Sequence, residues 1–353
     1  MNFIDKLRNH KLRFKEKFSN LYSKQLLRSG KILIKSPILS LKKGVLKVMI
    51  GLTYECQCNC EYCCSGMYIK KKEDELTTGE VKALVDNISR FPFIGILVSF
   101  FGGEPLIKKD VFDLIKYTNK RGLFTEIETN GILLSLDNVK RLKKSGLHHL
   151  FIRIEHSNPE FHDRISNFEG CFEKAIEGIK YCVNERLSCS ISTVATKEKI
   201  HTGQIREIID LGKKLKVTSV RLLYPTLAGK WLKENVKILT EEEKKAVKEL
   251  LSPDFVYLES SYVCTKELNR ICPSRQKKMF YISCYGEVQP CPFVPLVFGN
   301  IRQKTITRIL EKMWQYPFFQ DTDCSGCLMH DVKFQNTYID HSKLNAQSII
   351  EIK

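Results

Sequence analysis

The sequence predicts an α/β fold in which a partial barrel carries a basic extension before it and a Cys-rich domain after it. From residue 45 onward, short β-branched runs alternate with amphipathic stretches, the pattern of repeated βα units around a parallel sheet. Cysteines gather in a loop after the first of these runs and again near the C-terminus, which indicates metal sites. The 43% hydrophobic content over 353 residues is sufficient for a large core.

Six runs are expected as strands and five stretches as helices of the barrel. The strands are expected at residues 45–53, 95–101, 124–128, 150–155, 188–195 and 218–224. The helices are expected at residues 78–90, 109–121, 137–145, 168–185 and 203–215. Six such units in succession favour a partial, TIM-like (β/α)6 barrel, whose active-site residues lie at the carboxyl ends of the strands.

The chain divides into five segments. They are a basic amphipathic extension (1–44), the barrel (45–240), a connecting helix and linker (241–262), a Cys-rich domain (263–333) and a tail (334–353). The connecting helix is expected from Thr240 to Leu251, because Thr240 with Glu243 three residues later forms a capping-box pattern.

The loop after the first predicted strand contains Cys56, Cys60 and Cys63 in a C-x3-C-x2-C spacing. Thiols crowded on one short loop are typical of iron–sulfur or zinc sites. Three thiols leave one position of a cubane cluster open to a ligand that is not protein, which suggests chemistry. A zinc site with a fourth ligand elsewhere remains an alternative, because thiol spacing does not identify the metal.

A second motif, Phe101-Gly102-Gly103-Glu104-Pro105, ends the second predicted strand. Paired glycines let the backbone approach a ligand closely, and the adjacent carboxylate accepts hydrogen bonds from a ligand ammonium. A strand with a Cys loop followed by a strand with Gly-Gly-Glu-Pro is a specific combination.

With these two motifs the sequence resembles the radical S-adenosylmethionine (SAM) enzymes over roughly residues 45–330. The resemblance implies a 4Fe-4S cluster on Cys56, Cys60 and Cys63, with the amino and carboxylate groups of SAM on the fourth iron. It also implies that Tyr62 is the aromatic residue before the third cysteine. The residues that would hold the methionine ammonium are Gly102, Gly103 and Glu104.

Further segments are similar to the same family. Glu128-Thr129-Asn130-Gly131 resembles the end of its third strand, which makes Asn130 a cofactor-binding candidate. Phe161-His162-Asp163-Arg164 followed by Gly170-Cys171-Phe172 resembles the segment after its fourth strand. Many relatives have Ser-x-Asp-Gly where this chain has Arg153-Ile154-Glu155-His156, so Glu155 is the candidate for the ribose contact.

Four polar residues near strand ends are candidates for catalysis. They are His156, His162, Asp163 and Arg221. Helix capping is the alternative, and preferred, use of His162 and Asp163.

A second cysteine set begins at Cys272, and thirteen residues separate it from Gly286. Cys291 and the pair Cys324 and Cys327 complete the set, which resembles the C-terminal SPASM/Twitch auxiliary-cluster extension. No cysteine follows Cys327, so the match is to the shortened, Twitch-like form with one auxiliary 4Fe-4S cluster. Cys264 or Cys284 in place of an assigned ligand, and a structural zinc site, remain alternatives.

The first 44 residues contain twelve Lys or Arg against only Asp5 and Glu16. Their apolar residues recur at helical spacing, which predicts a basic amphipathic helix that binds an anionic membrane surface or a partner protein, or covers the barrel. No nucleic-acid-binding module accompanies the net charge of +17, so specific nucleic-acid binding is not expected.

The chain has no run of eighteen apolar residues and no secretory signal. A cytoplasmic protein is therefore expected, with peripheral membrane attachment as an alternative. Fourteen cysteines in a long intracellular chain indicate metal sites rather than disulfides.

The resemblance implies an enzyme that takes an electron from a donor such as flavodoxin or ferredoxin and cleaves SAM reductively to a 5'-deoxyadenosyl radical. This radical abstracts a hydrogen atom from the substrate. The first hypothesis for the substrate is a peptide or protein side chain, oxidised as in RiPP-type maturation, although residues 1–44 are too few for a separate leader-binding domain. The second is a small molecule such as a sugar, alcohol or lipid precursor, acted on by a radical dehydrogenase. The third is a metal-binding interaction protein without catalysis, against which the intact cysteines and Glu104 argue.

Overall fold

The computed structural model describes residues 43–65, 72–232, 238–252, 254–259, 272–320, 327–339 and 350–352. The predicted extension lies outside the described residues except for its last two, and so do Cys264 and Cys324. The membrane or partner role of residues 1–44 therefore stays a prediction.

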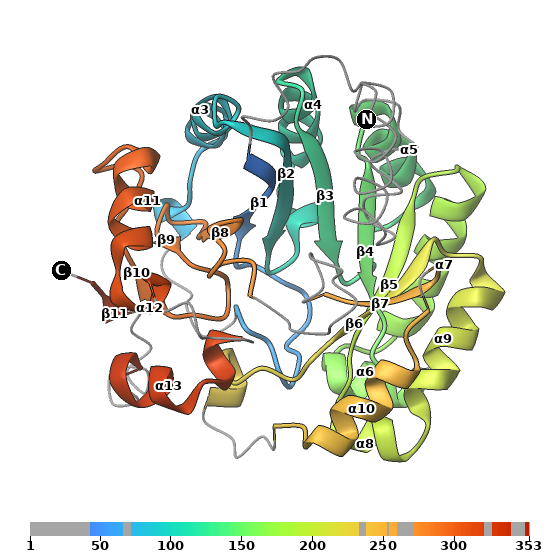
Figure 1. The fold of residues 1–353 in the computed structure, drawn as a ribbon. Coiled ribbons are helices and arrows are strands. Elements are labelled where there is room, and N and C mark those ends of the chain that lie inside the picture. The colour runs from blue at the N-terminus through green and yellow to red at the C-terminus, as the bar shows by residue number, and fades with distance from the viewer. Residues whose placement is uncertain are drawn as a thin grey trace, which may run out of the picture.

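A curved, mostly parallel sheet forms the centre of the fold (Figure 1). Its first six strands are β1 (Lys43–Thr53), β2 (Phe93–Gly102), β3 (Phe124–Thr129), β4 (His149–Arg153), β5 (Cys189–Val194) and β6 (Ser219–Leu223). They pair in sequence order, each parallel to the next, and β7 (Val256–Leu258) adds to β6. This order confirms the predicted partial barrel.

Helices between the strands lie on the outer side of the sheet (Figure 1). They are α3 (Thr78–Ile88), α4 (Val111–Lys120), α5 (Leu136–Ser145), α7 (Cys171–Asn184) and α9 (Gln204–Leu215), whereas the short helices α6 (Pro159–Ser166) and α8 (Lys197–His201) lie near the carboxyl ends of the strands. Their apolar faces and the outward-facing side chains of the strands form one continuous core.

Several predicted boundaries differ from the structure by two or three residues, and two of these differences bear on the site. The helix predicted at 168–185 begins at Cys171, because Gly170 adopts a left-handed conformation with φ 75°, and the short helices α6 and α8 were not predicted. The strand predicted at 150–155 ends at Arg153, so Glu155 lies in the loop beyond it. The capping box of Thr240 and Glu243 is confirmed at the start of α10 (Glu241–Glu249).

The C-terminal part continues the barrel sheet from its other edge. Strand β8 (Met279–Ile282) pairs parallel with β1, and β9 (Val288–Gln289) pairs antiparallel with β8. The sheet therefore has nine strands among the described residues, in the order β7-β6-β5-β4-β3-β2-β1-β8-β9. The rest of this part consists of β10 (Leu296–Val297), α11 (Ile306–Gln315), α12 (Pro317–Gln320), α13 (Val332–Tyr338) and β11 (Ile350–Glu351).

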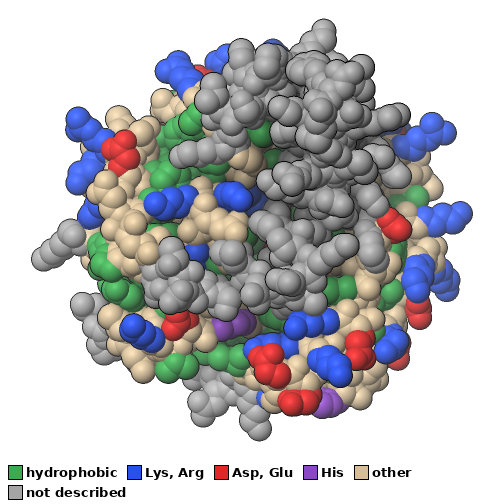
Figure 2. Space-filling model, in the orientation of Figure 1, with side chains coloured by type: hydrophobic (Ala, Val, Ile, Leu, Met, Phe, Trp, Pro, Cys, Tyr) green, Lys and Arg blue, Asp and Glu red, His purple; other side chains and the backbone are tan. Residues whose placement is uncertain are grey.

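Among the described residues, no helix is long and apolar enough to span a membrane. On the face drawn in Figure 2, the Lys and Arg side chains that the structure describes are spread over the surface, and Asp and Glu lie among them at the lower edge.

The packing of β8 on β1 depends on Gly51. A Cβ atom added at Gly51 would lie 2.6 Å from the hydroxyl of Tyr281 on β8 and 3.1 Å from the backbone nitrogen of Cys284. Gly51→Ala should therefore lower the free energy of unfolding by about 1–3 kcal/mol through overpacking. Denaturant unfolding measures this change.

Gly44 is the matched control for this prediction, because it lies on the same strand and a Cβ there would meet no atom within 4 Å. Gly44→Ala should leave stability unchanged or raise it slightly. Equal effects of the two substitutions would contradict close packing between β1 and β8.

Candidate active site

The Cys loop, residues 56–64, begins just beyond the carboxyl end of β1 and is tied to the barrel by its backbone. Asn59 N–H donates to the carbonyl of Ser166 at 3.1 Å, and Glu61 N–H donates to that of Ile165 at 3.0 Å. Both acceptors lie at the end of α6, so the loop is held against the helix that follows β4.

The thiols of the loop lie near one another. The Cys58 thiol contacts those of Cys171, Cys56 and Cys60, and these contacts, with burial, raise the pKa of Cys58. The contact with Cys58 lowers the pKa of Cys60 to about 6 and that of Cys171 to about 5. Thiolates are the ligand form for iron and zinc, so the lowered pKa of Cys60 favours the charge state that a cluster ligand needs.

The donor set of the loop fits an iron–sulfur cluster in its chemistry, because thiols are the usual ligands of such clusters. Within the described ranges, no three Cys, His, Asp or Glu side chains are gathered closely enough to hold a metal ion. Cys56, Cys60 and Cys63 lie on one loop and form no disulfides, and the guanidinium of Arg153 lies near Cys60 and Cys63.

The two predicted glycines pack directly on the backbone that leads into the Cys loop. Gly102 has φ 136°, and a Cβ there would lie 2.1 Å from the carbonyl oxygen of Thr53. A Cβ at Gly103 would lie 2.3 Å from the carbonyl oxygen of Glu55. Hydrogen bonds from Gly103 N–H to Thr53 (2.7 Å) and from Glu104 N–H to Glu55 (2.8 Å) fasten the motif there. No other residue type fits these two positions.

Glu104 is fully buried beside this joint. Its carboxylate accepts from Thr129 Oγ1 at 3.0 Å, from Asn130 N–H at 2.9 Å and from Leu106 N–H at 3.0 Å. Burial nevertheless raises the pKa of Glu104 to about 7. An adjacent ammonium would therefore strongly favour its ionised form.

Asn130 connects the two motifs. Its backbone N–H donates to Glu104, while its side-chain Nδ2 donates to Cys56 Sγ at 3.6 Å and to Gln57 Oε1 at 3.3 Å. The predicted cofactor-binding residues Gly102, Gly103, Glu104 and Asn130 are thus adjacent to the Cys loop.

Glu155 is buried, and its carboxylate forms ion pairs with cations of the protein. It pairs with Lys199 and with Arg153 Nε at 2.8 Å, and it accepts from Val194 N–H at 3.1 Å. Although burial opposes ionisation, the charges of Lys199 and Arg153 lower the pKa of Glu155 to about 2. A ribose contact by Glu155 stays a prediction.

Two of the catalytic candidates have structural partners. His162 is buried, and its Nδ1 accepts from the backbone N–H of Glu155 at 3.1 Å. Asp163 accepts from the N–H groups of Gly170 (2.6 Å) and Phe172 (2.8 Å) and so caps the start of α7. The preferred capping use of Asp163 is confirmed, while His162 fixes the loop beyond β4.

His156 and Arg221 lie in different surroundings. The His156 ring stacks on Phe161, with centroids 4.8 Å apart, and it borders a pocket. Arg221 is buried on β6, where it donates to Glu128 at 2.8 Å and to Glu259 at 3.2 Å and lies over the Phe151 ring.

Arg221 is part of a charged layer across the inside of the barrel. Lys47 on β1 completes the layer, since its Nζ lies 2.9 Å from Glu126 and 3.1 Å from Glu259. Among the described residues this layer holds two cations and three carboxylates, namely Lys47, Arg221, Glu126, Glu128 and Glu259. The interior of the barrel is therefore polar at this level.

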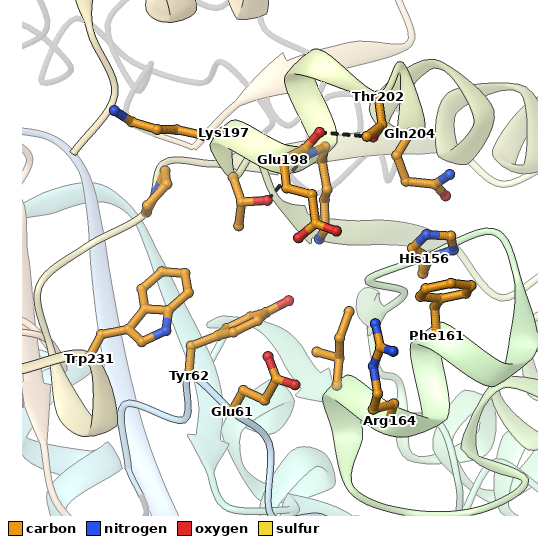
Figure 3. Close-up of a pocket in the computed structure, with 14 residues that line it drawn as sticks. Glu61, Tyr62, His156, Phe161, Arg164, Lys197, Glu198, Thr202, Gln204 and Trp231 are labelled. Carbon is orange, nitrogen blue, oxygen red and sulfur yellow. Dashed lines mark hydrogen bonds between the residues drawn. The ribbon is translucent and has the colours of Figure 1, made fainter. Parts of the chain in front are cut away.

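A pocket of about 350 Å³ opens beside the Cys loop (Figure 3). Its lining includes Glu61 and Tyr62 from the loop, His156 and Phe161 from beyond β4, and residues 196–199 around the start of α8. Figure 3 shows Tyr62 pointing toward the middle of the pocket and Trp231 beside it. The pocket thus adjoins the Cys loop at Glu61 and Tyr62.

Three of the four predicted auxiliary thiols lie in described residues, and they influence one another. Cys291 is fully buried near Cys272 and Cys327, and burial with their charges raises its pKa well above the ordinary value. Cys284 packs instead with Tyr54 and Tyr285. Because Cys284 packs with these tyrosines, the structure favours Cys272, Cys291 and Cys327 over Cys284 as auxiliary ligands. Cys264 and Cys324 lie outside the described residues.

The sequence reasoning missed several residues around the loop. Cys58 and Cys171 were left unassigned, yet their thiols are in contact. The Tyr54 and Tyr281 hydroxyls form a buried hydrogen bond of 2.9 Å between the barrel and the C-terminal part. Lys230 and Trp231 contact the Cys loop from a turn after β6, and no motif or spacing marks them.

Family models match two parts of the chain. The model described as "Radical SAM superfamily" matches residues 50–222, and that described as "Iron-sulfur cluster-binding domain" (SPASM) matches residues 272–328. Among curated proteins, the chain is 26% identical over 318 residues to an AdoMet-dependent heme synthase of Nitratidesulfovibrio vulgaris, covering 80% of this chain and 84% of that protein. It is 28% identical over 316 residues to a PqqA peptide cyclase of Bradyrhizobium diazoefficiens, covering 82% and 80%.

Solved structures show a similar fold. Streptococcus suis SuiB bound to the precursor peptide SuiA matches with a TM-score of 0.59 and 18% identity, covering 84% of this chain and 69% of that one. Native anSMEcpe with bound AdoMet matches with a TM-score of 0.59 and 16% identity, covering 81% and 84%.

The raised pKa of Glu104 predicts a pH-dependent stability. A carboxyl whose folded pKa lies above its unfolded value destabilises the folded protein as it ionises, so stability is lost as pH rises from about 4.5 to about 7. Between about pH 5 and about pH 8, the unfolding free energy of Glu104→Gln relative to wild type should rise by about 2 kcal/mol. Denaturant unfolding across this range measures it.

Glu80→Gln is the control, because the Arg302 hydrogen bond lowers the pKa of Glu80 to about 2. Its difference from wild type should stay constant over the same pH range. A constant difference for Glu104→Gln as well would show that Glu104 is ionised throughout.

Proposed function

Because the chain belongs to the radical SAM enzymes with a C-terminal iron–sulfur cluster-binding domain, we propose that it oxidises a peptide or protein side chain by hydrogen-atom abstraction. The observation that carries this proposal is the joint between the Cys loop and the Gly-Gly-Glu motif, which places three cysteines beside a buried carboxylate. The family carries 4Fe-4S clusters and binds SAM, so this is an enzyme with both cofactors.

Each residue of the joint has a role toward these cofactors. Cys56, Cys60 and Cys63 would ligate the first cluster, and Glu104 would accept from the amino group of SAM. When bound, the cofactors supply a 5'-deoxyadenosyl radical that removes a hydrogen atom from the substrate. The pocket beside Tyr62 has room for the adenosine group, and the buried walls of the barrel exclude water from the reacting atoms.

The C-terminal thiols would hold the second cofactor. Cys272, Cys291, Cys324 and Cys327 would close one auxiliary 4Fe-4S cluster, which suits it to accept an electron from the substrate. A flavodoxin or ferredoxin would supply the electron for the first cluster.

The charged layer inside the barrel supports a polar substrate. Two cations and three carboxylates suit the hydrogen-bonding groups of a peptide better than a flat, apolar ring system. The curated relatives include a PqqA peptide cyclase, and a solved structure of similar fold contains a precursor peptide.

A small-molecule substrate is the second candidate. It is favoured by the similarity to an AdoMet-dependent heme synthase, which extends over 80% of this chain. A sugar, alcohol or lipid precursor would be oxidised by the same hydrogen abstraction.

The cofactor assignment predicts an outcome for anaerobic reconstitution. Wild-type protein with two clusters should bind about eight irons per chain and release 5'-deoxyadenosine from SAM on reduction with dithionite. Cys60→Ala should lose 5'-deoxyadenosine release entirely, because two thiols do not hold the first cluster. Iron analysis and chromatography of the nucleoside measure both quantities.

Cys182→Ala is the matched control, since Cys182 is a buried thiol of α7 outside both cysteine sets. It should retain release of 5'-deoxyadenosine. Release of 5'-deoxyadenosine by Cys60→Ala would refute the assignment of Cys60 as a cluster ligand. Zinc in place of iron, without cleavage of SAM, would refute the assignment of the protein as an enzyme.

The substrate class is tested by mass spectrometry. Reconstituted enzyme with a precursor peptide encoded beside its gene should yield a peptide that has lost hydrogen, and Cys60→Ala enzyme should leave the peptide unchanged. Turnover of a sugar, alcohol or lipid precursor instead, with unchanged peptide, would replace the peptide proposal by the small-molecule one.

A further inference from the structure

A short turn after β6 contacts the Cys loop, and a lysine of this turn donates hydrogen bonds to it. The turn Gly229–Leu232 carries Lys230, whose Nζ donates to the carbonyl oxygens of Asn59 (3.0 Å) and Cys60 (2.7 Å) and to Asn59 Oδ1. Its backbone N–H donates to the carbonyl of Cys63 at 3.1 Å. One residue thus binds the loop at or beside two predicted cluster ligands.

The glycine before Lys230 brings the turn into contact with the loop backbone. Gly229 is buried with φ 58°, and a Cβ there would lie 2.2 Å from the carbonyl oxygen of Cys63 and 2.4 Å from Cα of Cys64. Any side chain at this position would push the turn away from the loop.

The residue after Lys230 packs on the loop from the pocket side. The Trp231 ring lies 4.6 Å from that of Tyr62, centroid to centroid, and both line the pocket (Figure 3). Contacts therefore reach the loop on its backbone and on its aromatic side chain.

The turn is also fixed from the C-terminal domain. Pro225, at the start of the same connection, accepts a hydrogen bond from His330 Nε2 at 2.7 Å. His330 lies three residues after the predicted auxiliary ligand Cys327. The connection from Pro225 to Trp231 therefore joins the surroundings of the two predicted cluster sites.

We propose that residues 229–231 are a clamp that holds the Cys loop ready for its cluster, with Lys230 as the positioning residue. This proposal depends on one part of the proposed function, namely that the Cys loop holds a cluster.

The physical reason lies in the cost of ordering the loop. A nine-residue loop with little secondary structure must fix its thiols in one arrangement, and each backbone residue that becomes ordered loses conformational entropy. Lys230 donates to the loop carbonyls of Asn59 and Cys60, and a charged donor makes strong hydrogen bonds to them. Part of the ordering is therefore complete before the cluster binds, and a bound cluster is released more slowly.

The test compares cluster retention in reconstituted, full-length variants. Lys230→Met keeps an unbranched side chain that is one heavy atom shorter, and it removes every Nζ hydrogen bond. It should release the first cluster to an iron chelator about tenfold faster than wild type, since charged hydrogen bonds are among the stronger ones. The first cluster is followed by its reduced electron paramagnetic resonance signal, because only that signal changes when SAM is added.

Two further variants separate positioning from general stability. Lys230→Arg, which retains donors and charge, should recover most of the wild-type retention. Lys213→Met, which removes an exposed lysine paired with Asp210 on α9, should match wild type. If Lys230→Met fails to fold, Trp231→Leu, which leaves the lysine in place, should show the faster release instead.

The outcomes are distinct. Equal release by Lys230→Met and wild type, or an auxiliary signal that is lost as fast as the SAM-responsive one, would overturn the clamp. Absence of any SAM-responsive signal in wild type would instead overturn the proposed function itself.

Discussion

The contact between the end of β1 and the end of β2 determines the geometry of the whole site. There, the Gly102 and Gly103 backbones pack against the carbonyl oxygens of Thr53 and Glu55 at distances that no Cβ would permit. Because β1 leads directly into the Cys loop and β2 directly into Glu104, this contact fixes the thiols relative to the carboxylate. The pocket, the Asn130 bridge to Cys56 and the turn at Lys230 are all arranged around it.

The barrel around this contact contains buried ionisable side chains, and burying charge costs free energy. Glu104 is buried and accepts hydrogen bonds from the neutral donors Thr129, Asn130 and Leu106. The layer of Lys47, Arg221 and three carboxylates lies inside the sheet. Buried charges of this kind seldom raise stability relative to apolar side chains of similar size. Their presence is better explained by the chemistry of the site than by the fold, because the outer core of the barrel is apolar throughout.

Local signals in the sequence were sufficient for much of this arrangement. The alternation of β-branched and amphipathic runs predicted the six strands, because the pattern of each strand lies within its own residues. The spacing of Cys56, Cys60 and Cys63 marked the loop. The turn at Gly170 moved one helix start, and the extra strands β8 and β9 came from a segment too short to show periodicity. Lys230 could not be predicted, because it meets Cys60 across 170 residues and is one of 57 Lys and Arg in the chain. Such a contact follows only from the closure of the barrel, which brings β6 back toward the loop after β1.

Strand β8 gives the C-terminal part a place inside the barrel sheet rather than beside it. Without β8, the hydrogen-bonding groups of β1 would form an open edge directly under the Cys loop, and such edges promote association between chains. The C-terminal part is therefore not a module that can be cut away at a linker, even though its cysteines form a set of their own. A shortened chain that ended after β7 would need a new strand, a covering helix or a second protein to protect β1.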